Sequence, residues 1–176
     1  LSTEQGRWLL NWMGRFMHSV FGGSYSLPLF NGIFALLFLA LSAGMIVSIF
    51  QVKNRLTAGL IGGLMTVFPA VVSMYFFMFL SLYYAIGIFF SVLAAWLTVK
   101  YPKNIIADIA AVLMAACSLG VYQAYFPDTV CILLMVVILK AGFGGVKEKT
   151  QWKEFFLMVV RFLVVMAAGI VVYFLI

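Results

Sequence analysis

Charge is the scarcest property of this chain. Only 9% of its 176 residues are charged, whereas 66% are hydrophobic. A soluble domain carries roughly 25% charged and 45–50% apolar residues, so the composition excludes a soluble protein. The apolar runs are about 20 residues long, which predicts membrane-spanning helices rather than the alternating strands of about 10 residues found in barrels.

Residues that support familiar active sites are also rare. The two cysteines, Cys117 and Cys131, fall inside apolar segments at a spacing that matches no metal site, so we interpret them as buried thiols. There is a single histidine and hence no histidine pair for a metal. The sequence also lacks a glycine-rich phosphate loop, a nucleophile elbow and the paired intramembrane acids that proton-coupled carriers tend to use.

The basic residues that are present sit in short loops between apolar runs. The formal charge of +6 therefore indicates membrane topology rather than nucleic-acid binding. Eight of the basic residues fall at alternate junctions and so share one side: Lys53, Arg55, Lys100, Lys103, Lys140, Lys147, Lys149 and Lys153. The positive-inside rule makes that side cytoplasmic and places the remaining junctions on the outer face.

We predict an all-α integral membrane protein, a polytopic bundle of about six transmembrane helices in a single domain. The expected spans are residues 28–50, 56–75, 82–99, 105–122, 127–141 and 154–176. The run from 56 to 100 is too long for one crossing, so we divide it at the aromatic stretch near Tyr75–Tyr84. Gly59 and Gly63 allow close helix contact in its first half, and Pro69 should kink it. We also expect the chain to be part of a longer protein.

Residues 7–21 predict an amphipathic helix ahead of the first span. Apolar side chains recur at steps of three and four residues, and the opposite face carries Arg7, Asn11, Arg15 and His18. Because polar groups line a whole face, this helix should lie in the outer membrane interface rather than cross the membrane. Gly22 should end it.

Asp108 and Arg161 are among the few ionisable residues within the predicted spans. Asp108 is about one turn inside its span, and we expect a structural ion pair with Lys100 or Lys103 rather than catalysis. Arg161 lies roughly 12 Å along its helix from Lys153, and we expect it to snorkel to the cytoplasmic surface.

The stretch from Ser118 to Thr129 joins two apolar segments through a polar, aromatic turn. Tyr122, Gln123 and Tyr125 fit either an interfacial aromatic belt or a binding site, and the amide of Gln123 favours a hydroxyl-rich ligand. Asp128 precedes an apolar helix, so we expect it to cap that helix, with an outward-facing acid or base as the alternative.

The arginines of the amphipathic helix also leave two interpretations open. Arg7 and Arg15 fit contact with lipid headgroups, and they equally fit binding of a phosphate, including that of a lipid-linked substrate. His18, on the same face, is expected to be interfacial rather than catalytic.

Four short elements then carry a family resemblance. They are Gly6-Arg7-Trp8, Gly23-Ser-Tyr-Ser-Leu-Pro28, Phe68-Pro69 and Ser118-Leu-Gly-Val-Tyr-Gln-Ala-Tyr125. In this order they resemble the type II Gtr family of bacterial membrane glucosyltransferases, over most of the chain up to about residue 140. The Tyr-Gln-Ala-Tyr element is the most specific of the four.

The resemblance implies a polytopic glycosyltransferase of the GT-C class in the bacterial cytoplasmic membrane. Such an enzyme moves a sugar, here glucose, from a polyprenyl-phosphate donor to an envelope glycan such as O-antigen on the outer face. In this class an acid in the first outer loop usually serves as general base. This chain begins just before the amphipathic helix, so the base is unassigned, with Glu4 and Asp128 as weak candidates.

The resemblance also implies substrate-binding residues. Arg7 is the first choice for the donor phosphate and Arg15 the second, with Tyr122, Gln123 and Tyr125 facing the sugar or acceptor. Besides the lipid-linked donor no cofactor is certain, and a divalent metal stays open although no ligand set is visible. The expected partners are the lipid-linked sugar, the glycan acceptor and membrane lipids, but not nucleic acid.

Two functions from other classes compete with glycosyl transfer. One is a carrier or flippase subunit for a lipid-linked sugar, and the other is a non-catalytic membrane scaffold. A carrier should place polar groups at mid-membrane on several spans, whereas here they gather at one face, which favours an enzyme. A scaffold would not require arginine, glutamine and tyrosine to cluster at that face.

Overall fold

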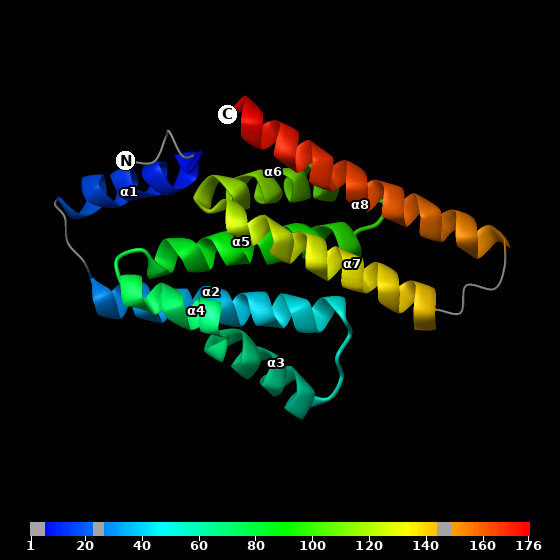
Figure 1. Cartoon of the computed structure of the whole chain (residues 1–176), viewed down its shortest axis with the longest axis horizontal. Coiled ribbons are helices and arrows are strands. Elements are labelled where there is room, and N and C mark those ends of the chain that lie inside the picture. Colours follow the sequence, from blue (N-terminus) through cyan, green and yellow to red (C-terminus); the bar gives the residue numbers. More distant parts are fainter. Residues whose placement is uncertain (1–5, 23–26, 144–148) are drawn as a thin grey trace.

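A computed structural model describes residues 6–22, 27–143 and 149–176 of the chain. These residues form helices joined by short connections, and no strand occurs among them (Figure 1). The elements are α1 (Trp8–Phe21), α2 (Pro28–Ile49), α3 (Arg55–Val67), α4 (Pro69–Met74), the 3-10 turn η2 (Tyr75–Phe77), α5 (Ser81–Lys100), α6 (Ile105–Val121), the 3-10 turn η3 (Gln123–Tyr125), α7 (Phe126–Phe143) and α8 (Lys149–Leu175).

Length and hydropathy make this a helical membrane protein, as predicted. Within the described residues, four helices are long and apolar enough to cross a bilayer: α2, α5, α8 and the continuous segment of η3 and α7. The predicted span 56–75 is a bent pair, because α3 meets the α4–η2 segment at 46° and would make a fifth crossing. The predicted kink at Pro69 is confirmed, since α4 begins at this proline. The predicted span 105–122 corresponds to α6, which has 17 residues and is about 26 Å long against a hydrocarbon core of about 30 Å. A count of six spans therefore stays a prediction.

The helix bundle has two distinct ends (Figure 1). At one end lie the connections at 50–54 and 101–104, together with the last turn of α7 and the first turn of α8. We call this the basic end, because its described positions include Lys53, Arg55, Lys100, Lys103 and Lys140. At the other end lie α1, η2, η3 and the last turn of α8, and we call it the tyrosine end.

Helix α5 is the centre of the packing and touches α2, α6 and α7. Its buried side chains are mostly small: Ala85, Ser91 and Ala95 have no exposed surface. Small residues let neighbouring helix backbones approach closely, which is the usual way that helices associate where the surroundings are as apolar as the side chains. The short residues of α5 therefore allow α2, α6 and α7 to pack closely around it.

A partly buried ion pair at the basic end corrects two predictions. The Nε of Arg161 in α8 donates to both carboxylate oxygens of Asp108 in α6 at 3.0 Å. Two further N–H groups donate at 2.9 Å to the carbonyls of Thr98 and Tyr101, where α5 ends. Asp108 is therefore paired with Arg161 and not with Lys100 or Lys103. Arg161 does not simply snorkel, because the last carbonyls of a helix lack helical partners and attract a cation.

Candidate functional site

The polar turn at 122–125 is built by an abrupt end to α6. Tyr122 adopts an extended backbone, with φ −157° and ψ 118°, while its N–H still donates to the Ser118 carbonyl at 3.0 Å. The 3-10 turn η3 then runs directly into α7. This geometry places the Tyr-Gln-Ala-Tyr element at the tyrosine end, between the end of one helix and the start of the next.

Three tyrosines meet at this turn. The ring centroid of Tyr84, in the first turn of α5, lies 5.6 Å from that of Tyr122 and 6.2 Å from that of Tyr125. The centroids of Tyr122 and Tyr125 are 5.3 Å apart. We call these three residues and Gln123 the tyrosine corner. Sequence reasoning placed Tyr84 only in an aromatic belt, because the distance of about forty residues along the chain gives no sign that the three rings touch.

Helix α5 holds the tyrosine corner in place. A Cβ atom on Gly87 would lie 2.9 Å from the Tyr125 ring, so only glycine lets this ring rest against the helix. One turn further, the Ser91 hydroxyl donates to the Tyr125 carbonyl at 2.9 Å, and the Thr129 hydroxyl donates to the Ser91 carbonyl at the same distance. Ser91 and Thr129 are fully buried, so these hydrogen bonds are protected from water.

The start of α1 packs onto the same corner. The guanidinium carbon of Arg7 lies 4.6 Å from the centroid of the Tyr122 ring, within the range of a cation–π interaction. Trp8 rests on Gly120, where a Cβ atom would come within 2.6 Å of the indole ring. The arginine-bearing helix and the Tyr-Gln-Ala-Tyr turn are thus in direct contact. Their location at one end of the molecule agrees with the prediction that they share a side.

Tyr173, near the end of α8, links these parts and was missed by sequence reasoning. Its hydroxyl accepts a hydrogen bond from Nε2 of Gln123 at 2.6 Å and donates one to the Gly6 carbonyl at 3.0 Å. Gly6 has φ +71°, a left-handed conformation that favours glycine. A lone tyrosine near the end of an apolar helix was the only available signal, and it does not reveal partners that are 50 and 167 residues away.

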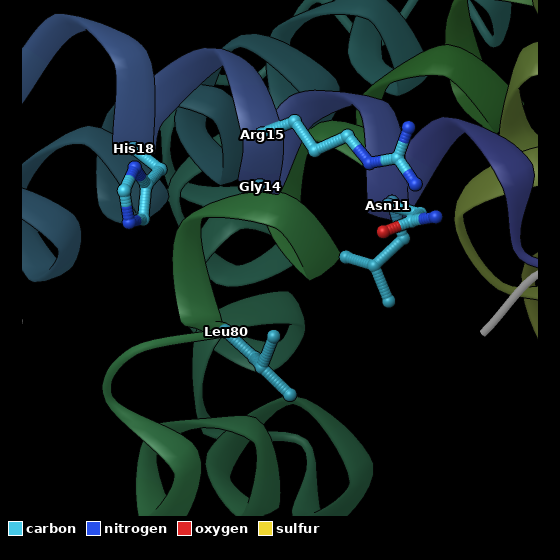
Figure 2. A pocket seen from close by; sticks show the side chains of 6 residues that line it. Asn11, Gly14, Arg15, His18 and Leu80 are labelled. Atoms are coloured by element: carbon cyan, nitrogen blue, oxygen red, sulfur yellow. The ribbon is translucent and has the colours of Figure 1, made fainter. Parts of the chain in front are cut away.

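Arg15 lies away from the corner, about two turns further along α1, in an open cleft (Figure 2). The cleft has a volume of about 470 Å³ and is lined by Leu10, Asn11, Gly14, Arg15, His18 and Leu80. A second cleft of about 490 Å³ shares Asn11 and Arg15 and is otherwise lined by Trp8, Leu9, Trp12 and Cys117. Arg7 lines neither of these two clefts.

The two candidate acids have different outcomes. Asp128 does not cap α7, because the helix already begins at Phe126 and follows η3 without a break. Asp128 is instead an exposed residue in the first turn of α7, three residues after Tyr125. Glu4 lies outside the described residues, as does most of the Gly23–Pro28 element. Among the side chains that the structure describes, no group of three or more metal-ligating residues occurs.

Long apolar helices with an arginine, three tyrosines and a glutamine in contact at one end define a polytopic membrane protein with a polar, aromatic site at a bundle end. The family model of the glucosyl transferase GtrII matches residues 2–176, and the chain therefore belongs to this family. This confirms the resemblance to the type II Gtr glucosyltransferases, which are a family of enzymes. No curated protein and no solved structure matches the chain.

Proposed function

We propose that this protein transfers glucose from a polyprenyl-phosphate donor to an envelope glycan at the tyrosine end of the bundle. The family supports glucosyl transfer. The observation that carries the choice of site is the contact between Arg7 and the Tyr122 ring, which joins the polar face of α1 to the tyrosine corner. Positive residues at the opposite end favour a tyrosine end that faces the cell exterior of the cytoplasmic membrane.

The tyrosine corner suits a sugar. Aromatic rings offer large, rigid apolar faces with a polar hydroxyl at the edge, which matches the mixed apolar and hydroxyl-bearing surface of a pyranose. Gln123 is exposed at this corner, and its side-chain amide is oriented by Tyr173. An amide both donates and accepts hydrogen bonds, so it can read sugar hydroxyls.

The transfer needs a base for the acceptor hydroxyl. In the reaction a bond forms between the acceptor oxygen and the anomeric carbon of glucose, and the bond from that carbon to the donor phosphate oxygen breaks. Polyprenyl phosphate leaves with the bonding electrons, and the acceptor proton passes to the base. Asp128 is the one carboxylate at the tyrosine end among the described residues, which makes it our candidate for this role.

Incubating membranes that carry the full-length protein with radiolabelled polyprenyl-phosphate glucose tests this proposal. Label should appear in envelope glycan, and an Arg7→Ala variant that accumulates normally should lose most of it. Arg55→Ala, at the basic end, is the matched control and should transfer like the wild type. Wild-type membranes that release no label into glycan would contradict glucosyl transfer, whereas full transfer by Arg7→Ala would remove Arg7 from the site.

The same assay tests the candidate base. An Asp128→Asn variant keeps the size of the side chain but cannot take up the proton, so transfer should fall by about a hundredfold or more, as is typical when a general base is removed. A carboxylate that only interacts favourably with the start of α7 would leave the rate nearly unchanged in the asparagine variant.

A further inference from the structure

The polar face of α1 lines a cleft to which no residue of the tyrosine corner contributes. Asn11, Arg15 and His18 lie at spacings of four and three residues, so they project from one side of the helix. Figure 2 shows the guanidinium of Arg15 beside the amide of Asn11, with the His18 ring further along the helix. Leu80, just before α5, lies across the cleft from α1.

The chemistry of this cleft suits an anion. Arg15 brings five N–H donors in a planar fork, and Asn11 and His18 add further donors. Among the described residues no carboxylate lines the cleft, and the Arg15 side chain makes no hydrogen bond or ion pair there. A guanidinium fork with neighbouring amide and imidazole donors matches the geometry of a phosphate.

The adjoining cleft is suited to an apolar chain. Apart from Asn11 and Arg15, it is lined by indole, aliphatic and thiol groups. On the outer side of α1, Trp12 is 62% exposed, Phe16 56% and Val20 58%. In a membrane protein such apolar surface faces lipid tails, so the cleft beside Arg15 and a lipid-facing surface share one helix.

Arg7 is less suited to the same task. One face of its guanidinium lies over the Tyr122 ring, and it lines neither cleft. The two arginines are eight residues apart, about 12 Å along α1. Arg7 therefore belongs to the tyrosine corner, and Arg15 belongs to the cleft that Asn11 and His18 also line. This reverses the order in which the sequence analysis ranked the two arginines for the donor phosphate.

We propose that Asn11, Arg15 and His18 form a binding site for the phosphate group of an isoprenoid phosphate, with its chain passing along Trp12 toward the lipid. The choice of an isoprenoid phosphate rests on the proposed function, in which the donor is a polyprenyl phosphate. The phosphate then binds along the middle of α1, and the sugar that it carries is presented toward the corner at the start of the same helix.

Binding of a sugar-free polyprenyl monophosphate tests the site without any transfer chemistry. The full-length protein is placed in phosphatidylcholine nanodiscs, and the Kd for the radiolabelled lipid is measured by filtration. Arg15→Gln should raise the Kd by about tenfold and His18→Gln by about threefold, since each removes a hydrogen bond to a charged group. Arg7→Gln should change it by less than about threefold, and Arg55→Gln serves as the control that matches the wild type.

Competition identifies the source of the phosphate. Unlabelled polyprenyl phosphate should displace the probe at low concentration, whereas inorganic phosphate and phosphatidylglycerol should need far higher concentrations. An unchanged Kd in Arg15→Gln, or an equal loss in Arg7→Gln, would overturn the site. Displacement by phosphatidylglycerol as effective as that by polyprenyl phosphate would overturn the isoprenoid assignment. None of these results depends on glucosyl transfer. A failure of the phosphate site can therefore be distinguished from a failure of the proposed function.

Discussion

Glycine decides how closely side chains approach the helices at the tyrosine end. Gly87 admits the ring of Tyr125, and Gly120 admits the indole of Trp8. By contrast, a Cβ atom on Gly59 in α3 would meet nothing within 4 Å. All three glycines lie inside apolar helices, so the sequence does not show which of them contact a neighbouring side chain. Only the packing of the helices shows it.

We expect Gly87→Ala to destabilise the protein by about 1–3 kcal/mol, because an added methyl group in a filled space forces the Tyr125 ring to move. The same change should lower glucosyl transfer, since that ring is part of the tyrosine corner. Gly59→Ala is the matched control and should leave stability unchanged or raise it by up to about 1 kcal/mol. Thermal unfolding in detergent measures both variants. Equal unfolding temperatures for the two would show that Tyr125 is not held against Gly87.

Charged residues at the other end of the molecule show where sequence reasoning reaches its limit. Asp108 was predicted to be ion-paired, and it is, but its partner is 53 residues away in α8. The nearby lysines, Lys100 and Lys103, were the natural choice because distance along the chain was the only distance available. Arg161 prevails because one guanidinium can satisfy the Asp108 carboxylate and two carbonyls at the end of α5 at once.

At the scale of elements, the start of α1 is held by contacts with two helices, α6 and α8. Arg7 and Trp8 rest on the end of α6, and Tyr173 of α8 bonds to the carbonyl of Gly6 just before α1 begins. Gly22, with φ +67°, ends the helix as predicted, and its N–H donates to the His18 carbonyl. The amphipathic pattern was therefore sufficient to predict α1 and its end. Whether the helix lies flat in the membrane interface stays a prediction.

We expect Tyr173→Phe to reduce glucosyl transfer by about fivefold or more, because it removes a hydroxyl that hydrogen-bonds both Gln123 and Gly6, and such a bond contributes about 1 kcal/mol. The ring is retained, so packing at the end of α8 should be kept. Tyr101→Phe, at the basic end, is the control for loss of a tyrosine hydroxyl and should transfer normally. Wild-type transfer by Tyr173→Phe would mean that this link does not position the corner.

At the scale of the whole molecule, composition and charge predicted an all-helical membrane protein with its loop lysines at one end. The apolar runs predicted the helices, and Pro69 predicted the bend between α3 and α4. The loop lysines predicted that one end would be basic. The location of α1 and the Tyr-Gln-Ala-Tyr turn at one end of the molecule also followed, because both were assigned to the same side. The parts that did not follow are Tyr84, Tyr173 and the clefts beside Arg15, since each depends on how helices distant in the sequence pack together.

The central claim is that the tyrosine end of the bundle faces the cell exterior, where the envelope glycan is found. Labelling of single cysteines in intact cells with a membrane-impermeant maleimide tests it most directly, in a full-length protein with Cys117 and Cys131 replaced by serine. We expect Ser19→Cys, exposed on α1, to be labelled in intact cells, and Lys103→Cys, exposed at the basic end, to be labelled only after lysis. Labelling of Lys103→Cys but not Ser19→Cys in intact cells would contradict the account.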